Sequence, residues 1–124
     1  MFKFLAVFLG GGIGSVLRYM IDILYIRYGS MTFPFATFAV NLVACFLMGC
    51  CMAYFLATHT NGFYKCLFVV GFCGGFSTMS ALSFEVFEML KSGEILPAVL
   101  YIFLSFVVCV CMTALGFYWT KCYV

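Results

Sequence analysis

The stretch Gly71–Glu88, GFCGGFSTMSALSFEVFE, decides the fold, because it places glycines, hydroxyls and carboxylates inside an apolar segment long enough to cross a membrane. A helix that only has to cross lipid needs Leu, Val and Phe, so the doublet Gly74-Gly75 and the hydroxyls after it require another explanation. Polar groups inside a membrane span usually mark a pathway, and we interpret the stretch as a broken helix that lines an ion route. The hydroxyls belong to Ser77, Thr78, Ser80 and Ser83.

The whole chain has the composition of a membrane protein. It has 124 residues, of which 67% are hydrophobic and 8% are charged, whereas soluble domains carry roughly 25% charged residues. This length accommodates about four membrane-spanning helices of about 20 residues with short connections, and it leaves no room for a soluble domain. We therefore expect an all-α membrane protein in which residues 1–124 form a single four-helix transmembrane domain.

Apolar runs and the polar residues between them divide the chain into four helical spans. The N-terminal run resembles the start of a signal peptide, but it continues through Arg18 and Tyr19 without a clear cleavage site, so we take it as the first span. We expect the third helix to be broken near its middle. The predicted spans are Phe2–Tyr28, Phe33–Ala57, Tyr64–Met89 and Leu96–Thr120, separated by Gly29-Ser30, by His59–Gly62, and by Lys91–Glu94 with Pro97 at the start of the fourth helix.

Four spans put both ends of the chain on one side of the membrane, and the positive charges favour neither orientation. Lys3, Lys65 and Lys121 lie on one side, against Arg27 and Lys91 on the other. A chain with so little bias can insert in both orientations, which favours an antiparallel dimer with a two-fold axis in the membrane plane. The alternative, one weakly determined orientation, stays open on charge alone.

The eight cysteines show no metal-site spacing, and most lie inside the apolar spans, so we interpret them as small packing residues. His59 is the only histidine and lies in a loop, which leaves little support for a zinc or haem site. No pairing of a nucleophile with a base indicates an enzyme. We also expect no nucleic-acid partner. The cysteines within the spans are Cys45, Cys50, Cys51, Cys73, Cys109 and Cys111.

The first span combines closely spaced glycines with a charge. Within GGGIGSVLRY, Gly10 and Gly14 form a GxxxG spacing, which favours close helix contact over a direct pore role. Arg18 is a charge inside a span, so it must snorkel, pair or line a cavity. Asp22 lies on the same helix face and is a candidate partner. The positive charge of Arg18 would also suit a vestibule that attracts anions.

In the second span, Thr37 and Asn41 are one helical turn apart and are the only strongly hydrogen-bonding side chains in a long apolar run. Asn41 has two interpretations that the sequence does not separate. Its amide can join two helices by an interhelical hydrogen bond. It can also donate to a dehydrated anion.

Four segments in this order, GGGIGSVLRY, FATFAVN, GFCGGFSTMSALSFE, and YIFLS with MTAL, resemble the Fluc (CrcB) family of bacterial fluoride channels across all four spans. The resemblance implies an antiparallel, dual-topology homodimer in the lipid of the bacterial inner membrane, with two fluoride pathways. It also implies a structural Na⁺ ion on the dimer axis, bound by the backbone carbonyls of Gly74 and Ser77. Asn41 matches the pore asparagine of the family, Thr37 a hydroxyl on its polar track, and Glu85 its third-helix acid.

The chain departs from the family pattern at the pore. The family usually has two phenylalanines three residues apart on the third helix, whose positive ring edges face the passing fluoride. This chain has Met79 and Leu82 there, which are weakly polar at best, so we expect a modified pore. On the fourth helix, Tyr101 and Ser105 fit the pattern, but Cys109 and Cys111 stand where more strongly polar side chains are expected.

The function expected from this resemblance is a passive fluoride channel that lowers cytoplasmic fluoride. One alternative is the less active partner subunit of a heterodimeric fluoride channel, which the replacement of the phenylalanine pair motivates. Another is a small proton-coupled multidrug exporter with Glu85 as proton carrier, although Glu85 lies near the end of its span, where an interfacial position is favoured. The residues expected to line the pathway are Asn41, Thr37, Met79, Ser80, Leu82, Ser83, Tyr101 and Ser105, with Arg18 and Glu85 as vestibule or structural charges.

Overall fold

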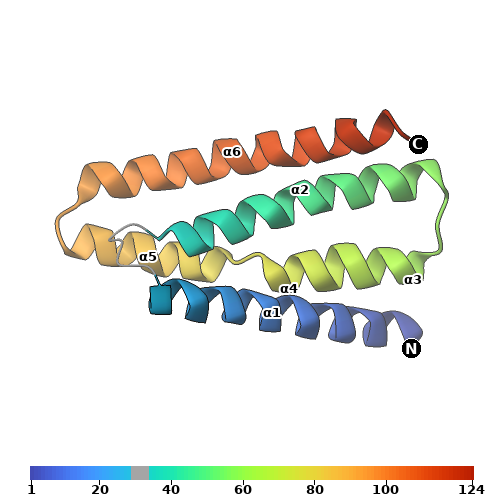
Figure 1. Ribbon diagram of the computed structural model, residues 1–124, viewed down its shortest axis with the longest axis horizontal. Helices are drawn as coiled ribbons and strands as arrows, with labels where there is room; N and C mark the ends of the chain where they lie inside the picture. The colour runs from blue at the N-terminus through green and yellow to red at the C-terminus, as the bar shows by residue number, and fades with distance from the viewer. Residues whose placement is uncertain (29–33) are drawn as a thin grey trace.

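The computed structural model describes residues 1–28 and 34–124, and these residues form a bundle of long helices (Figure 1). Within them, four helical stretches are long and apolar enough to cross a membrane, which confirms the predicted all-helical membrane fold. The elements in chain order are α1 (Phe2–Tyr28), α2 (Phe35–Ala57), α3 (Gly62–Lys65), the π-helix η1 (Cys66–Cys73), α4 (Gly74–Phe76), α5 (Met79–Lys91) and α6 (Ile95–Lys121).

The predicted boundaries agree with these elements to within a few residues. The third span begins at Gly62 and ends at Lys91, slightly longer than predicted, and Pro97 falls in the first turn of α6, where its missing N–H costs little. The predicted helix start at Phe33 and the predicted break at Gly29-Ser30 lie outside the described residues. Both chain ends lie at the same end of the bundle, as an even number of spans requires (Figure 1).

Helices α2 and α6 lie side by side and run in the same direction (Figure 1), and their backbones come into close contact. A Cβ atom added to Gly49 would lie 2.1 Å from the carbonyl oxygen of Thr113, and one added to Gly116 would lie 2.2 Å from that of Phe46. Small residues allow this approach, which is a common way for membrane helices to associate. The contact fixes the register of α2 against α6.

A second close contact joins α1 to η1 and α4. A Cβ atom on Gly10 would lie 2.1 Å from the Leu67 carbonyl oxygen, and one on Gly14 would lie 2.4 Å from that of Phe72. From the other side, a Cβ atom on Gly75 would lie 2.4 Å from the Gly11 carbonyl oxygen. The structure therefore confirms helix contact as the role of the GxxxG spacing in the first span.

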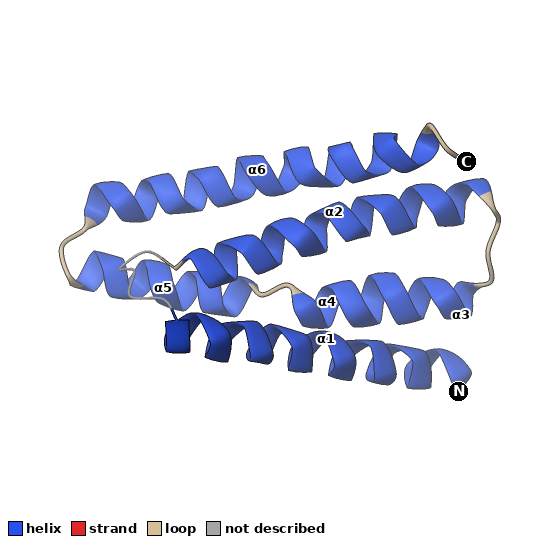
Figure 2. Ribbon diagram, viewed as in Figure 1, coloured by secondary structure: helices blue, strands red, loops and turns tan. Residues whose placement is uncertain are grey.

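The third span is interrupted between α4 and α5, as predicted (Figure 2). Ser77, with ψ of 156°, and Thr78, with φ of −147°, have extended backbone conformations. Thr78 then caps α5, because its side-chain oxygen accepts a hydrogen bond from the amide of Ala81. Two small apolar cores flank the break. One contains Val40, Ala44 and Phe76, and the other contains Leu82, Val86, Met89, Ala98 and Tyr101.

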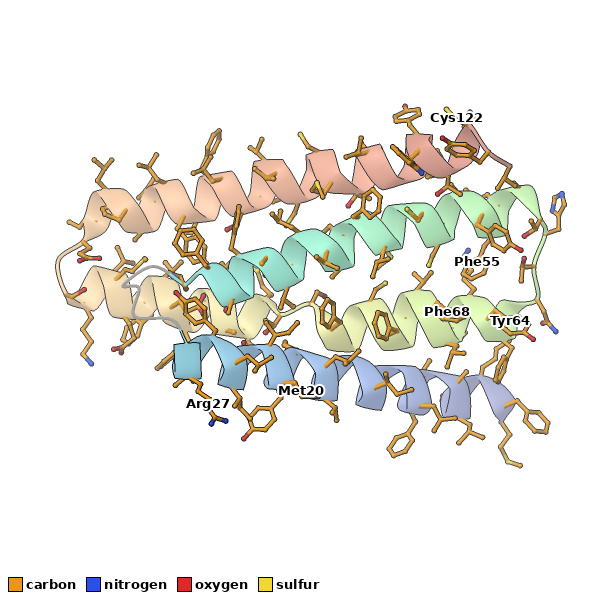
Figure 3. All side chains as sticks on the ribbon, in the orientation of Figure 1. Met20, Arg27, Phe55, Tyr64, Phe68 and Cys122 are labelled. Atoms are coloured by element: carbon orange, nitrogen blue, oxygen red, sulfur yellow. The ribbon has the colours of Figure 1, made fainter. Side chains whose placement is uncertain are left out.

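Many large apolar side chains point away from the bundle, as expected where helices face lipid. Figure 3 shows Met20 and Arg27 on the outer side of α1, and Met20 is half exposed. The interior contacts are therefore made by few residues, and most of these lie near the break in the third span or at the glycine contacts.

Candidate functional site

A partly open cavity of about 310 Å³ lies where the third span is interrupted. Most of its wall is apolar, with a few polar groups among the apolar ones. Helix α2, the break with the start of α5, and α6 each contribute to it. The lining residues are Asn41, Cys45, Ser77, Thr78, Met79, Leu82, Ile102, Ser105, Phe106 and Cys109.

Asn41 binds the backbone of the break at two points. Its Oδ1 accepts a 2.8 Å hydrogen bond from the amide of Thr78, and its Nδ2 donates a 3.1 Å hydrogen bond to the Thr78 carbonyl oxygen. The interhelical role of Asn41 is therefore confirmed. Its amide has two N–H donors, and within residues 1–28 and 34–124 only one of them has an acceptor. The other is available to a molecule or ion in the cavity.

This link leaves two carbonyls in the third span without their helical partners. In an uninterrupted α-helix the Thr78 amide would donate to the carbonyl of Gly74, and the Ala81 amide to that of Ser77. Instead, the Thr78 amide donates to Asn41, and the Ala81 amide donates to the Thr78 side chain at 3.2 Å. Gly74 is exposed, and apart from its own helix no atom of the described residues lies within 4 Å of the position of a Cβ atom on it.

Two hydroxyl groups bind the carboxyl group of Glu85. They belong to Thr37 and Tyr101, which lie one helical turn before Asn41 in α2 and Ser105 in α6. The hydroxyl of Thr37 donates to Glu85 Oε1, and that of Tyr101 donates to Oε2 at 2.8 Å. Thr37 and Tyr101 are both almost fully buried, with 4% and 1% of their surfaces exposed. The structure thus brings together three of the predicted site residues from α2, α5 and α6.

The parallel packing of α2 and α6 arranges these residues as successive facing pairs, one pair per helical turn. Thr37 and Tyr101 share Glu85, and Asn41 and Ser105 line the same cavity. On the next turns, Cys45 and Cys109 also line the cavity, and Gly49 contacts the backbone of Thr113. Each α6 residue follows its α2 partner by the same interval in sequence.

Other predicted pathway residues divide into two groups. Met79 and Leu82 line the cavity, and so does Ser105, whose buried Oγ has no hydrogen-bond partner in the described part of the chain. Ser80 and Ser83 lie outside it, on the exposed side of α5. Ser80 is hydrogen-bonded to the Thr78 hydroxyl, and Ser83 donates to the Met79 carbonyl oxygen at 2.9 Å.

Asp22 was a candidate partner of Arg18, but no ion pair joins them in the part of the chain that the structure describes. Its Nε is buried and has no hydrogen-bond partner among the described residues. The two side chains are on neighbouring turns of α1, but proximity along a helix did not bring their charged groups together.

Sequence reasoning missed several members of the site. Ile102 and Phe106 gave no signal, because α6 is apolar on all sides. Cys45 follows Asn41 by one helical turn and was therefore detectable as part of the same face. Thr78 was noticed as a hydroxyl, but its role as the cap of α5 and the partner of Asn41 depends on where the helix breaks.

We expect Tyr101→Phe to destabilise the protein, because it removes one of the two donors to the half-buried carboxyl group of Glu85. A hydrogen bond of this kind contributes about 1–3 kcal/mol. Thermal unfolding in detergent measures the loss. The exposed Tyr118 on the same helix provides the control, since Tyr118→Phe removes the same hydroxyl from the surface. Equal melting temperatures for the two variants would contradict a structural role for the Tyr101 hydroxyl.

Fold and site together define a multi-pass helical membrane protein with a polar-lined cavity at an interrupted helix. The profile described as "CrcB-like protein, Camphor Resistance (CrcB)" matches residues 5–117, and the chain belongs to this family. This confirms the resemblance seen in the sequence motifs. Together with the four membrane-spanning stretches, the bacterial relatives place the chain in the bacterial inner membrane as a multi-pass protein.

Three relatives, each named "Fluoride-specific ion channel FluC", illustrate the similarity. The protein from Azobacteroides pseudotrichonymphae is 38% identical over 120 residues, which is 96% of both chains. The protein from Phocaeicola vulgatus is 45% identical over 89 residues, which is 72% of this chain and 74% of the relative. The protein from Pectobacterium atrosepticum is 39% identical over 116 residues, or 91% and 89% of the two chains.

Proposed function

We propose that this chain is a fluoride-selective channel, in which residues 1–124 act as one transmembrane unit, and that it lowers cytoplasmic fluoride by passive efflux. Beside the named function of the relatives, the proposal rests on two hydrogen-bond donors in the cavity that have no acceptor among the described residues. These are the second N–H of Asn41 and the buried hydroxyl of Ser105. A dehydrated anion needs such donors to replace its water, and passive flow requires no catalytic chemistry.

Met79 and Leu82 give the proposed pore a different lining from the phenylalanine pair of the family. Both line the cavity, and neither offers the positive ring edge of a phenylalanine. In this chain the hydrogen-bond donors of α2 and α6 therefore carry the recognition of fluoride. Arg18, whose buried Nε has no hydrogen-bond partner in residues 1–28 and 34–124, is the proposed source of positive charge for an anion vestibule.

The active form that we propose is an antiparallel homodimer with two pathways. The exposed side of the third span carries Ser80, Ser83 and Gly74, together with a carbonyl that has lost its helical partner. Backbone groups without partners at membrane depth are tolerated only where protein or water covers them. A second copy of the chain would cover this side, and the weak charge bias allows it to insert in the opposite orientation.

The proposed homodimer also gives the carbonyls of Gly74 and Ser77 a role. A two-fold axis through this side would bring together four carbonyl oxygens, which are hard ligands suited to a hard cation such as Na⁺. The donor set fits, because the break frees both carbonyls from helical hydrogen bonds. A Cβ atom on Gly74 would meet no other helix among the described residues, which leaves room for a partner at this site. Bound cation would reduce the repulsion among these oxygens.

Sodium removal should therefore lower the melting temperature of the wild-type dimer. A ligand present at 100 times its dissociation constant stabilises the folded state by ~2.7 kcal/mol. Replacement of Na⁺ by a bulky organic cation in a thermal unfolding experiment measures this effect. In Gly74→Val the added side chain crowds the axis, so the melting temperature should depend less on sodium. A wild-type protein whose stability and fluoride flux are both indifferent to sodium would contradict the site.

A growth experiment tests the proposed function in cells. Bacteria that lack their own fluoride exporter should grow in fluoride when they express this chain alone, because a homodimer needs no second gene product. Immunoblots of membrane fractions control for expression. If the chain reaches the membrane but protects only when a second, homologous chain is present, the protein is a partner subunit of a heterodimer. If it protects in neither case, the proposed function is wrong.

A further inference from the structure

Two thiols face each other across α2 and α6 at the cavity. Cys45 and Cys109 both line the cavity, one helical turn before the close contact between Gly49 and the backbone of Thr113. They follow the Asn41 and Ser105 pair by one helical turn. Fluoride conduction gives no use for a pair of thiols, which are weak donors and soft ligands.

The helix packing holds this pair together. One turn beyond the thiols, a Cβ atom on Gly49 would lie 2.1 Å from the Thr113 carbonyl oxygen, so the two backbones are already in contact there. The contact at Gly116 adds a second point at which α2 and α6 cannot slide or separate. The fold therefore places the two cysteines at facing positions of α2 and α6, from which their side chains can act as one ligand pair.

Because both ligands are thiols, the pair favours one class of metal ion. Thiolates prefer soft metals, and within residues 1–28 and 34–124 no group of three or more metal-ligating side chains occurs. Two sulfur ligands alone suit a soft cation that accepts linear two-coordination, as Hg²⁺ does. On binding, each thiol releases its proton to solvent and donates a sulfur electron pair to the metal, so two thiolates neutralise the double charge. A neutral complex suits a mainly apolar wall, because burial of a net charge would be costly.

We propose that Cys45 and Cys109 form a two-thiolate binding site for a soft divalent cation of the mercuric type, and that the bound ion blocks the cavity. Binding of the ion depends on the thiol pair alone. Blockage rests on the proposed channel function, since only a conducting cavity can be blocked.

Retention of Hg²⁺ against a competing monothiol tests binding of the ion. Purified full-length protein is loaded with Hg²⁺, washed with excess glutathione, and analysed for mercury per chain. A second thiolate held in place acts at an effective concentration that a free monothiol does not match. Wild type should therefore retain about one ion per chain. Cys45→Ser and Cys109→Ser should each lose at least about tenfold in retention, whereas Cys111→Ser, at an exposed position on the same helix, should behave as wild type.

Equal retention in all four proteins would overturn the site. So would loss in Cys45→Ser and Cys73→Ser without loss in Cys109→Ser, because the buried Cys73 of η1 would then be the true partner. X-ray absorption of mercury retained by the wild type adds a measurement that depends on no variant. Two sulfur neighbours support the site, and one sulfur neighbour overturns it.

Fluoride efflux from liposomes separates blockage from binding. Flux through wild type and Cys111→Ser should fall at least about tenfold with Hg²⁺ at one ion per chain, while Cys45→Ser and Cys109→Ser keep their own metal-free rates. Retained mercury with unchanged wild-type flux overturns the blockage. An absence of flux before metal is added overturns the channel function, and the retention experiment then still decides whether the thiol pair binds the ion.

Discussion

We expect Asn41→Asp to abolish fluoride efflux. The substitution removes the donor that binds the Thr78 carbonyl oxygen, and a carboxylate then faces that oxygen at the distance now spanned by a 3.1 Å hydrogen bond. The same negative charge repels the anion in the cavity. At a separation of about 4 Å and an effective dielectric constant of about 20, two unit charges repel by about 4 kcal/mol. Since each 1.36 kcal/mol is a factor of about ten, the loss should exceed a hundredfold.

The control for this prediction is the same change at an exposed position. Asn61→Asp alters the loop before α3, where the Asn61 side chain makes no cap hydrogen bond, and its efflux should match that of wild type. Cross-linking in membranes shows whether each variant still assembles. If Asn41→Asp assembles and conducts fluoride at the wild-type rate, Asn41 does not belong to the pathway.

Gly75→Val should prevent the bundle from folding. A Cβ atom there would lie 2.4 Å from the carbonyl oxygen of Gly11 and 2.9 Å from its Cα atom, and both are backbone atoms that cannot rotate away. Overpacking usually costs about 1–3 kcal/mol, and we expect a larger cost here because a helix has to move. Gel filtration and thermal unfolding in detergent measure the loss of folded protein.

Gly12→Val is the matched control, because outside α1 no atom in residues 34–124 lies within 4 Å of the position of a Cβ atom on Gly12. It makes the same substitution in the same helix pair, on the exposed side of α1. We expect its yield and melting temperature to remain close to those of wild type. Similar losses in the two variants would show that valine harms these helices by a route other than the contact between α1 and α4.

The sequence predicted the four spans because hydropathy depends only on local composition. It also predicted the break in the third span, but the glycine doublet that drew attention to it is not where the backbone departs from the helix. Gly74 and Gly75 are both helical, and the departure occurs at Ser77 and Thr78. Gly75 instead serves the contact with α1. The glycine doublet and the break lie next to each other in the sequence. Only the three-dimensional packing shows that Gly75 serves the contact with α1 and that the break is a separate feature.

The sequence predicted many of the residues of the candidate site, but not the contacts between them. Thr37, Asn41 and Glu85 were found as polar groups in apolar spans, but the bonds from Thr37 and Tyr101 to Glu85 depend on the register of α2, α5 and α6. That register is set by backbone contacts at Gly49 and Gly116, which the sequence does not specify. Spacing alone also left the role of Arg18 open: Asp22 lies on the next turn of the same helix, but no ion pair joins the two among the described residues.

Efflux from liposomes that contain the purified chain tests the central claim most directly, with fluoride and chloride measured on the same preparation. The proposed channel predicts rapid fluoride efflux and chloride efflux no faster than from empty liposomes, because a narrow pore lined by a few donors rejects the larger anion. A folded, dimeric protein that releases no fluoride above the empty-liposome rate, or that releases chloride equally fast, would contradict the claim.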